Sequence, residues 1–256
     1  MKPKRQNLII LLSVLFISSS GWVNAQENIT AKDVIDKADK LMRGNSSYSE
    51  MTMKIIRPKW DRSLSFKVWS KGTEYSIVYV TAPAKEKGQV FLKRKHEMWN
   101  WVPSIERMIK IPPSMMMQSW MGSDITNDDI VKESSIVKDY MHEIIGSESI
   151  QGHECYKIQL IPNEDAPVVW GKIISWISKK ESFILKNEYY DEDGFLVNLE
   201  TLSKIKNVGD RVIPTYFEMI PVEKEGYKTI MEFNKIEFNN PIRDDFFSIQ
   251  NMKRIR

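Results

Sequence analysis

The sequence contains only one cysteine, Cys155, so no disulfide can form within the chain. Stability therefore depends on a hydrophobic core, and a domain of about 230 residues is large enough to bury one. Cys155 stands in a strand-like segment, Glu154–Ile161, where a small packed residue is expected rather than a nucleophile.

The sequence also lacks an apolar run of the roughly 20 residues that a membrane-spanning helix requires. Leu8–Ile17 is an apolar run of about ten residues that follows three basic residues, and small residues end the segment at Ala25. Residues 1–25 are therefore predicted to be a cleaved signal peptide, with Gln26 as the first residue of the exported protein. No cysteine stands at this boundary, so the exported protein is expected to carry no lipid anchor.

The exported chain also lacks an excess of charge of either sign. The formal net charge is +3, but the leader holds three basic residues and no acidic one, so its removal leaves 34 basic against 34 acidic side chains. A balanced chain gives no electrostatic support for a nucleic-acid partner.

Common signatures of catalysis and metal binding are absent. The three histidines are far apart, and neither a glycine-rich phosphate loop nor a Gly-x-Ser-x-Gly motif occurs. Asp124, Asp128 and Asp129 lack the alternating acids and closing glutamate of a calcium loop, and helix capping explains Asp129. The sequence predicts no enzyme, no cofactor and no metal; a hydrolase acting through Asp124 and Asp128 is the remaining catalytic alternative.

Strand-like segments dominate the rest of the chain. Before them, Thr30 and Asp33 predict the capped start of an amphipathic helix of about four turns, which Gly44 ends. Alternation of apolar and polar residues then predicts about eleven or twelve short strands separated by turn residues. They are Tyr48–Arg57, Ser63–Ser70, Thr73–Thr81, Gln89–Lys93, Glu97–Val102, Tyr140–Ser147, Cys155–Ile161, Lys172–Ser178, Ile184–Tyr190, Leu196–Ile205, Val212–Pro221 and Lys228–Phe238.

One long antiparallel sheet of this kind cannot stay flat and must curl. No glycine-rich linker interrupts it, so residues 26–256 are predicted to form a single domain. The predicted fold class is mainly β with α, an unclosed antiparallel β-barrel of about eleven strands with a helical lid. This interpretation requires an apolar hollow that the protein's own side chains do not fill.

The stretch from Trp99 to Ile130 combines aromatic, methionine and acidic residues. Ser114 and Gly122 predict a helix of about two turns between them, and Thr126 predicts the start of another brief helix. The first helix is apolar nearly all round, so it is either an ordinary buried helix or a cover for an apolar surface that is sometimes exposed. Methionine suits the cover because its flexible side chain repacks around ligands of different shape.

Several pieces of this stretch form a pattern: Trp101-Val-Pro103, Arg107-Met-Ile109, Gly122-Ser-Asp-Ile-Thr126 and Asp129-Ile130, with support from Tyr189-Tyr-Asp-Glu-Asp-Gly194. The pattern resembles the outer-membrane lipoprotein-sorting protein family, which includes a periplasmic carrier and an outer-membrane receptor of Gram-negative bacteria. The likeness covers the whole exported chain, and Gly-Ser-Asp-Ile-Thr is its most specific part.

The resemblance implies an unclosed barrel whose apolar concavity shelters acyl chains. The expected function is that of a monomeric periplasmic carrier, which binds acyl chains of lipids or lipoproteins and moves them towards the outer membrane. The resemblance also implies an inner-membrane lipid exporter of the multi-helix type as a partner. The alternative is a lipid-responsive sensor or interaction domain of the same fold that regulates a membrane partner.

Candidate site residues follow from position and from the resemblance. For each aromatic residue taken singly, core packing is the simpler explanation. The family's carrier holds its lid with a strand arginine, for which Arg57 is the candidate. The lid and mouth candidates are Trp99, Trp101, Met115, Met116, Met117, Trp120 and Met121; the interior candidates are Phe66, Trp69, Tyr75, Tyr79, Trp170 and Trp176; the shared pattern adds Arg107, Ser123, Asp124 and Asp129.

Overall fold

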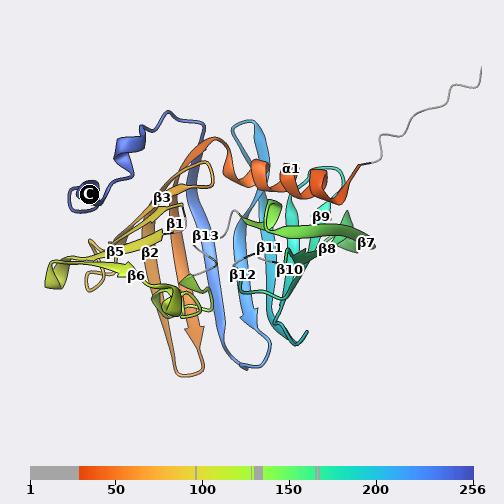
Figure 1. The fold of residues 1–256 in the computed structure, drawn as a ribbon, viewed down its shortest axis with the longest axis horizontal. Coiled ribbons are helices and arrows are strands. Elements are labelled where there is room, and N and C mark those ends of the chain that lie inside the picture. The colour runs from red at the N-terminus through yellow and green to blue at the C-terminus, as the bar shows by residue number, and fades with distance from the viewer. Residues whose placement is uncertain (1–28, 96, 128, 130–134, 165, 167) are drawn as a thin grey trace, which may run out of the picture.

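The computed structural model describes residues 29–256 except for residues 96, 128, 130–134, 165 and 167 (Figure 1). The predicted leader and Asp128 lie outside the described residues. In the described part of the chain, no helix is both long enough and apolar enough to cross a membrane.

The chain consists mostly of strands. The helical elements are α1 (Ala31–Arg43), η1 (Pro103–Ile105), η2 (Pro113–Met115), η3 (Trp120–Gly122), η4 (Ser135–Val137), η5 (Asp244–Phe246) and α3 (Ile249–Met252), where η marks a 3₁₀ turn. The strands are β1 (Ser46–Arg57), β2 (Trp60–Lys71), β3 (Tyr75–Ala82), β4 (Val90–Arg94), β5 (Glu97–Val102), β6 (Arg107–Ile111), β7 (Tyr140–Ile150), β8 (His153–Pro162), β9 (Lys172–Ser178), β10 (Ile184–Tyr190), β11 (Leu196–Val208), β12 (Arg211–Pro221) and β13 (Lys228–Phe238).

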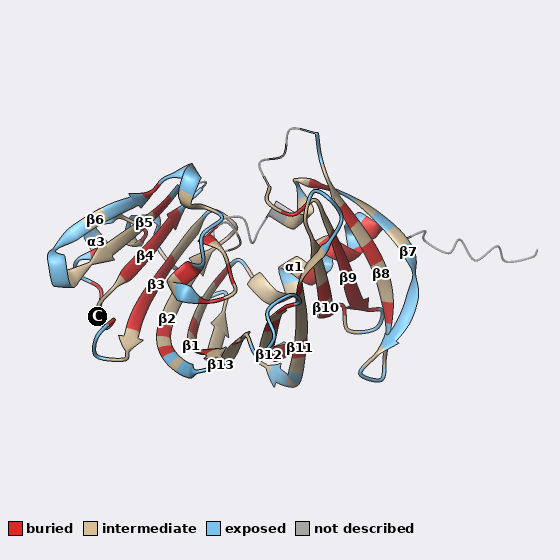
Figure 2. Ribbon diagram, turned by 90° about the horizontal axis from the view of Figure 1, so that it is seen from below, coloured by how far each residue is buried: buried red, intermediate tan, exposed pale blue. Residues whose placement is uncertain are grey.

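These strands form one antiparallel sheet in the order β6-β5-β4-β3-β2-β1-β13-β12-β11-β10-β9-β8-β7. The sheet curls into a trough and its two outer strands, β6 and β7, do not meet (Figure 2). The predicted unclosed antiparallel barrel is thus confirmed. The described residues form 13 strands, namely the twelve segments predicted from alternation and Arg107–Ile111, which joins the sheet by pairing with β5.

Helix α1 lies across the inner face of the trough, as the periodicity predicts. Its start is fixed by a capping box, in which the Asp33 amide donates to the Thr30 Oγ1 at 3.1 Å and the Thr30 amide donates to the Asp33 carboxylate. Val34, Ile35 and Ala38 are buried against a cluster on β7, β8 and β9. Packing of this apolar face, rather than the helix's own propensity, holds α1 over one half of the sheet.

The other half of the sheet is apolar on both faces. Val78 and Val80 of β3 face the inside, whereas Ile77 and Tyr79 face the outside, where Phe247, Met252 and Ile255 of the C-terminal segment cover them. Lys71 anchors this segment by donating to the backbone carbonyl of Ile242 at 3.0 Å. The outer face of β2 to β5 is therefore a second packed core, and the inner face is left for the cavity.

The prediction of a two-turn helix between Ser114 and Gly122 is wrong. The structure has two separate 3₁₀ turns there, η2 and η3, with Ser119 extended between them and Met121 at φ 53°. The reason is that the backbone pairs across a loop: the Trp120 amide donates to the Ile125 carbonyl at 2.7 Å, and Ser119 bridges to Thr126. These hydrogen bonds replace those of a helix too short to be stable alone.

Gly171, which precedes β9, packs against the backbone of the β10–β11 turn. A Cβ on Gly171 would lie 2.4 Å from the Asp191 carbonyl oxygen and 2.7 Å from the Glu192 Cα, and backbone atoms cannot swing aside. We expect Gly171→Ala to lower the free energy of unfolding by about 1–3 kcal/mol in guanidinium titrations. Gly146→Ala in β7 is the control because open space surrounds it, and it should change stability by less than about 0.5 kcal/mol.

Candidate functional site: an apolar cavity in the trough

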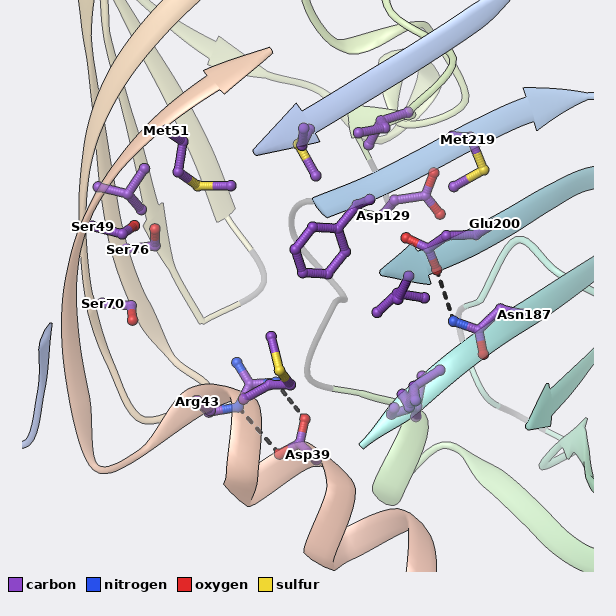
Figure 3. A pocket seen from close by; sticks show the side chains of 18 of the residues that line it. Asp39, Arg43, Ser49, Met51, Ser70, Ser76, Asp129, Asn187, Glu200 and Met219 are labelled. Atoms are coloured by element: carbon purple, nitrogen blue, oxygen red, sulfur yellow. Dashed lines mark hydrogen bonds and ion pairs between the residues drawn. The ribbon is translucent and has the colours of Figure 1, made fainter. Parts of the chain in front are cut away.

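A cavity of about 360 Å³ lies on the inner face of the sheet, between β1–β4 on one side and β9–β11 on the other (Figure 3). Its size is at the low end of the range of about 300–1,000 Å³ found for small-molecule sites. The middle of the cavity is lined by apolar side chains from five neighbouring strands. They include Met51 and Met53 of β1, Phe66 and Val68 of β2, Val78 of β3, Met231 and Phe233 of β13, and Phe217 and Met219 of β12.

Trp120 and Ile125 close the cavity from the segment between β6 and β7. Trp120 is buried, and its ring lies 5.6 Å from the ring of Phe66 and 5.4 Å from that of Phe91, measured between centroids. Ile125 is buried beside it. The Ser123 hydroxyl donates to the Trp120 carbonyl at 2.7 Å and so holds the turn that points both side chains inward. We call residues 118–127 the cover segment.

An ion pair fastens the cover segment to the end of β1. Arg57 donates to the Asp124 carboxylate at 3.0 Å and to the Gly122 carbonyl at 2.9 Å. The two side chains are only 8% and 5% exposed, so water screens the pair little. Thr229 of β13 completes the contact by donating to Asp124 at 2.7 Å. We call this arrangement the latch.

A second arginine from the same hairpin strengthens the attachment but leaves polar atoms uncompensated. Arg62 of β2 donates to the Met121 carbonyl and, at 3.3 Å, to Glu86. The Arg62 Nε and the Glu86 Oε2 are buried without a hydrogen-bond partner among the described residues, and so is the Trp120 Nε1 of the cover segment. Each such group costs about 1–3 kcal/mol, which lowers the free energy needed to lift the segment into water.

After the latch, Thr126 and Asp129 exchange the two hydrogen bonds of the predicted capping box, whereas most of the brief helix expected to follow lies outside the described residues. The Asp129 amide donates to the Thr126 Oγ1 at 3.0 Å, and the Thr126 amide donates to the Asp129 carboxylate at 2.9 Å. The Trp170 indole also donates to Asp129, at 2.8 Å, and both residues line the cavity. Burial raises the pKa of Asp129, because desolvation outweighs these hydrogen bonds.

A buried polar network forms the cavity wall on β9, β10 and β11. Ser175 donates to Asn187 at 2.6 Å, Asn187 donates to Glu200 at 2.7 Å, and Tyr189 donates to Glu200 at 3.0 Å (Figure 3). Burial, followed by the Glu200 charge, raises the pKa of Tyr189 well above its usual value, so the phenol stays protonated as a donor. This wall is anionic and internally hydrogen-bonded.

The two capping boxes should respond to pH in opposite directions. The pKa of Asp129 is higher in the folded protein than in the unfolded protein, so the native protein loses stability as pH rises from the unfolded-state pKa to the folded-state pKa. The pKa of Asp33 is lower in the folded protein, so the native protein gains stability as pH rises from the folded-state pKa to the unfolded-state pKa. Between about pH 3 and 7, the stability of Asp129→Asn relative to the native protein should rise, whereas that of Asp33→Asn should fall. Urea titrations across this range measure both, and parallel trends for the two variants would refute the assignment.

The structure brings only part of the predicted site to the cavity. Phe66, Trp120, Asp129 and Trp170 line the cavity. Met115, Met116 and Met121 pack against the core cluster that contains Trp120 and do not line the cavity. Tyr75 borders the cavity, but its ring stacks on Phe247 outside. Met117 is exposed, and so is Arg107 at the start of β6.

The expected positions of the other aromatic residues are corrected. Trp69, Tyr79, Trp99 and Trp101 lie on the outer face under the C-terminal segment, and Lys253 stands 5.0 Å from the Trp101 ring. Trp176 lies outside as well, where its indole donates to Glu148 at 2.8 Å. Strand alternation does not say which face is the inner one, and two separate outer clusters take these residues. The C-terminal segment covers the first, and Trp176 packs with Cys155 and Phe183 of neighbouring strands in the second.

Sequence reasoning missed the contribution of β12 and β13. Phe217, Met219, Met231 and Phe233 complete the cavity because β13 pairs with β1 and closes the middle of the sheet. Alternation within β12 and β13 indicates that these residues share one face of each strand. Only the pairing of β13 with β1 brings that face next to Met51. Among the described residues, no group of three or more His, Cys, Asp or Glu side chains is arranged to hold a metal.

Fold and cavity together define a class of protein, an unclosed β-barrel with an internal apolar site under a latched cover. Solved structures share this fold. A DUF1329 family protein from Desulfovibrio piger has a TM-score of 0.80 at 23% identity, over 87% of this chain and 97% of that chain. A putative outer membrane lipoprotein-sorting protein domain from Vibrio parahaemolyticus has a TM-score of 0.78 at 18% identity, over 88% and 98%. A LolA superfamily protein from Nitrosomonas europaea has a TM-score of 0.74 at 24% identity, over 87% and 99%.

Comparison of the sequence with family models and with curated proteins gives one match. A family model described as "Uncharacterized protein" matches residues 72–254, and the chain belongs to that family. Comparison with curated proteins found no significant match. The structural neighbours confirm the resemblance to lipoprotein-sorting proteins as one of fold.

Proposed function

We propose that this protein is a non-enzymatic carrier that binds an acyl chain of a lipid or lipidated protein in the cavity of the trough. The observation that carries the proposal is the cavity of about 360 Å³, walled by apolar strand residues and closed by Trp120 and Ile125. Burying each acyl methylene contributes about 0.8 kcal/mol, so a long chain gains on the order of 10 kcal/mol before ordering costs. Apolar area that can be covered and uncovered is sufficient for this task.

Reversible closure is the second requirement of a carrier, and the latch suits it. Arg57, Asp124 and Thr229 hold the cover segment by directional contacts, in addition to the packing of Trp120 in the core cluster. The uncompensated Arg62 and Trp120 atoms lower the cost of opening. The proposal therefore assigns Arg57 and Asp124 to positioning the cover, not to catalysis.

The wider setting of this function rests on the leader and on the resemblance. We extend the proposal to a protein exported to the periplasm, unanchored, that carries lipid or lipoprotein towards the outer membrane. Two of the similar structures are described as a lipoprotein-sorting domain and a LolA superfamily protein, which supports lipid as the ligand class. The proposed membrane partner is an inner-membrane lipid exporter of the multi-helix type.

Binding of a fluorescent fatty acid to purified, delipidated protein tests the proposal. We expect saturable binding of about one equivalent, accompanied by a change in tryptophan emission because Trp120 lines the cavity. Trp120→Phe should retain binding but lose part of that change, because Trp170 also lines the cavity. Absence of saturable binding to the native protein would contradict the proposed function.

A further inference from the structure

Four polar side chains form a straight row across the inner face of β1 to β4. Ser47 is paired with Ser70, Ser70 with Ser76, and Ser76 with Lys93, and all four line the cavity. The Ser47 and Ser70 hydroxyl oxygens lie 2.7 Å apart. We call these residues the hydroxyl–lysine row; it lies at the opposite end of β1 from Arg57 and the latch.

The face changes from polar to apolar along the strands. Beyond the hydroxyl–lysine row, the next positions on the same face are Ser49, Val68 and Val78, followed by Met51, Phe66 and Val80. A surface with donors at one end and hydrocarbon along its length matches an amphiphile that lies parallel to the strands. The tail then points to Trp120 and the cover segment.

Ser49 adds a further hydroxyl to the polar end of the cavity. It is only 4% exposed and borders the cavity, yet its hydroxyl has no hydrogen-bond partner among the residues that the structure describes. Its hydroxyl can therefore donate to a polar group of a molecule bound in the cavity. Figure 3 shows Ser49, Ser70 and Ser76 grouped on one wall, with Asp129 and Glu200 on the opposite side.

The charges indicate the sign of the head group. Lys93 is 7% exposed and adds an ammonium group to the row, whereas Arg43 and Asp39 of α1, at the same end of the cavity, form an ion pair without net charge. Hydroxyl and ammonium groups donate hydrogen bonds, and charge-assisted bonds to an anion are the strong ones. Asp129 and Glu200 would repel an anion from the other wall, which fixes the orientation.

We propose that the hydroxyl–lysine row is a head-group site and that the ligand is an amphiphile with a single anionic head, carboxylate or phosphate. This assignment rests on the proposed carrier function and adds to it the chemistry and direction of the bound lipid. The head lies between Ser49, Ser76 and Lys93, and the tail lies along Met51 and Phe66.

Calorimetric titration with dodecanoate, dodecyl phosphate and dodecanol tests the assignment, because the three share one tail. We expect at least one anion to bind the native protein about tenfold more tightly than dodecanol. The anion that binds more tightly identifies the head group as carboxylate or phosphate. Lys93→Met should abolish this preference and leave dodecanol binding unchanged, and Ser76→Ala should reduce the preference by about threefold.

Matched controls lie on the other face of β2. Lys67 and Ser65 alternate with the cavity-facing Phe66 and so lie on the other face. The variants Lys67→Met and Ser65→Ala should therefore retain the full preference for the anion over dodecanol. Equal affinity of the native protein for anions and dodecanol would overturn the head-group site but leave the carrier function standing. An unchanged preference in both Lys93→Met and Ser76→Ala would also overturn it, whereas failure of all three probes to bind would contradict the carrier function itself.

Discussion

Arg57→Met is expected to lower the free energy of unfolding by about 3–5 kcal/mol, because it leaves the Asp124 carboxylate buried without its partner. The Thr229 hydroxyl still donates to Asp124, but a neutral hydrogen bond does not replace the guanidinium charge. A bound fluorescent fatty acid should also dissociate faster, because the Gly122 carbonyl loses its contact with β1. Denaturant titration and stopped-flow displacement measure the two effects.

The matched control is Arg243→Met. Arg243 pairs with Asp245 at 2.7 Å, but these side chains are 86% and 66% exposed, so the pair contributes little. The double variant Arg57→Met with Asp124→Leu should recover much of the lost stability, because a buried pair replaced by apolar groups is often neutral. If Arg57→Met costs no more than Arg243→Met, the latch does not hold the cover.

Filling the cavity should have the second large effect. Val68 lies in the middle of the inner face, paired with Ser49 and Val78, and lines the cavity. We expect Val68→Trp to occupy the space of the acyl chain and to weaken fatty-acid binding by at least about tenfold. Stability should not fall, because the added ring fills a void instead of displacing packed atoms.

Val212→Trp is the control for this variant because Val212 lies on β12, is 39% exposed and is away from the cavity lining. It should bind fatty acid as the native protein does. Unchanged affinity in a folded Val68→Trp protein would mean that the ligand binds elsewhere on the molecule.

The sequence was sufficient for the elements of the sheet. Period-two alternation located each predicted strand to within a few residues, and Asp193-Gly194 marked the β10–β11 turn, where Gly194 has φ 85°. Thr30 and Asp33 likewise marked the start of α1, because a capping box is a local hydrogen-bond arrangement. Signals of this kind depend only on neighbouring residues.

The candidate site was harder because it depends on contacts between distant residues. Both faces of β3 are apolar, and only the C-terminal residues Phe247 and Met252 decide that Tyr79 belongs to the outer core. The cover segment adopts its loop because Arg57 and Thr229, far away in sequence, fix Asp124. Local periodicity cannot register either effect, so it does not distinguish Trp120, which lines the cavity, from Trp101, which lies under the C-terminal segment.

Direct analysis of lipid that remains bound during purification tests the central claim. The protein should be isolated without detergent from the cells that make it, examined by native mass spectrometry, and then extracted and analysed for acyl chains. A curled sheet with a dry hollow predicts a folded protein carrying about one equivalent of acyl lipid, which Val68→Trp loses. Lipid-free native protein that also takes up no fatty acid when offered would contradict the account.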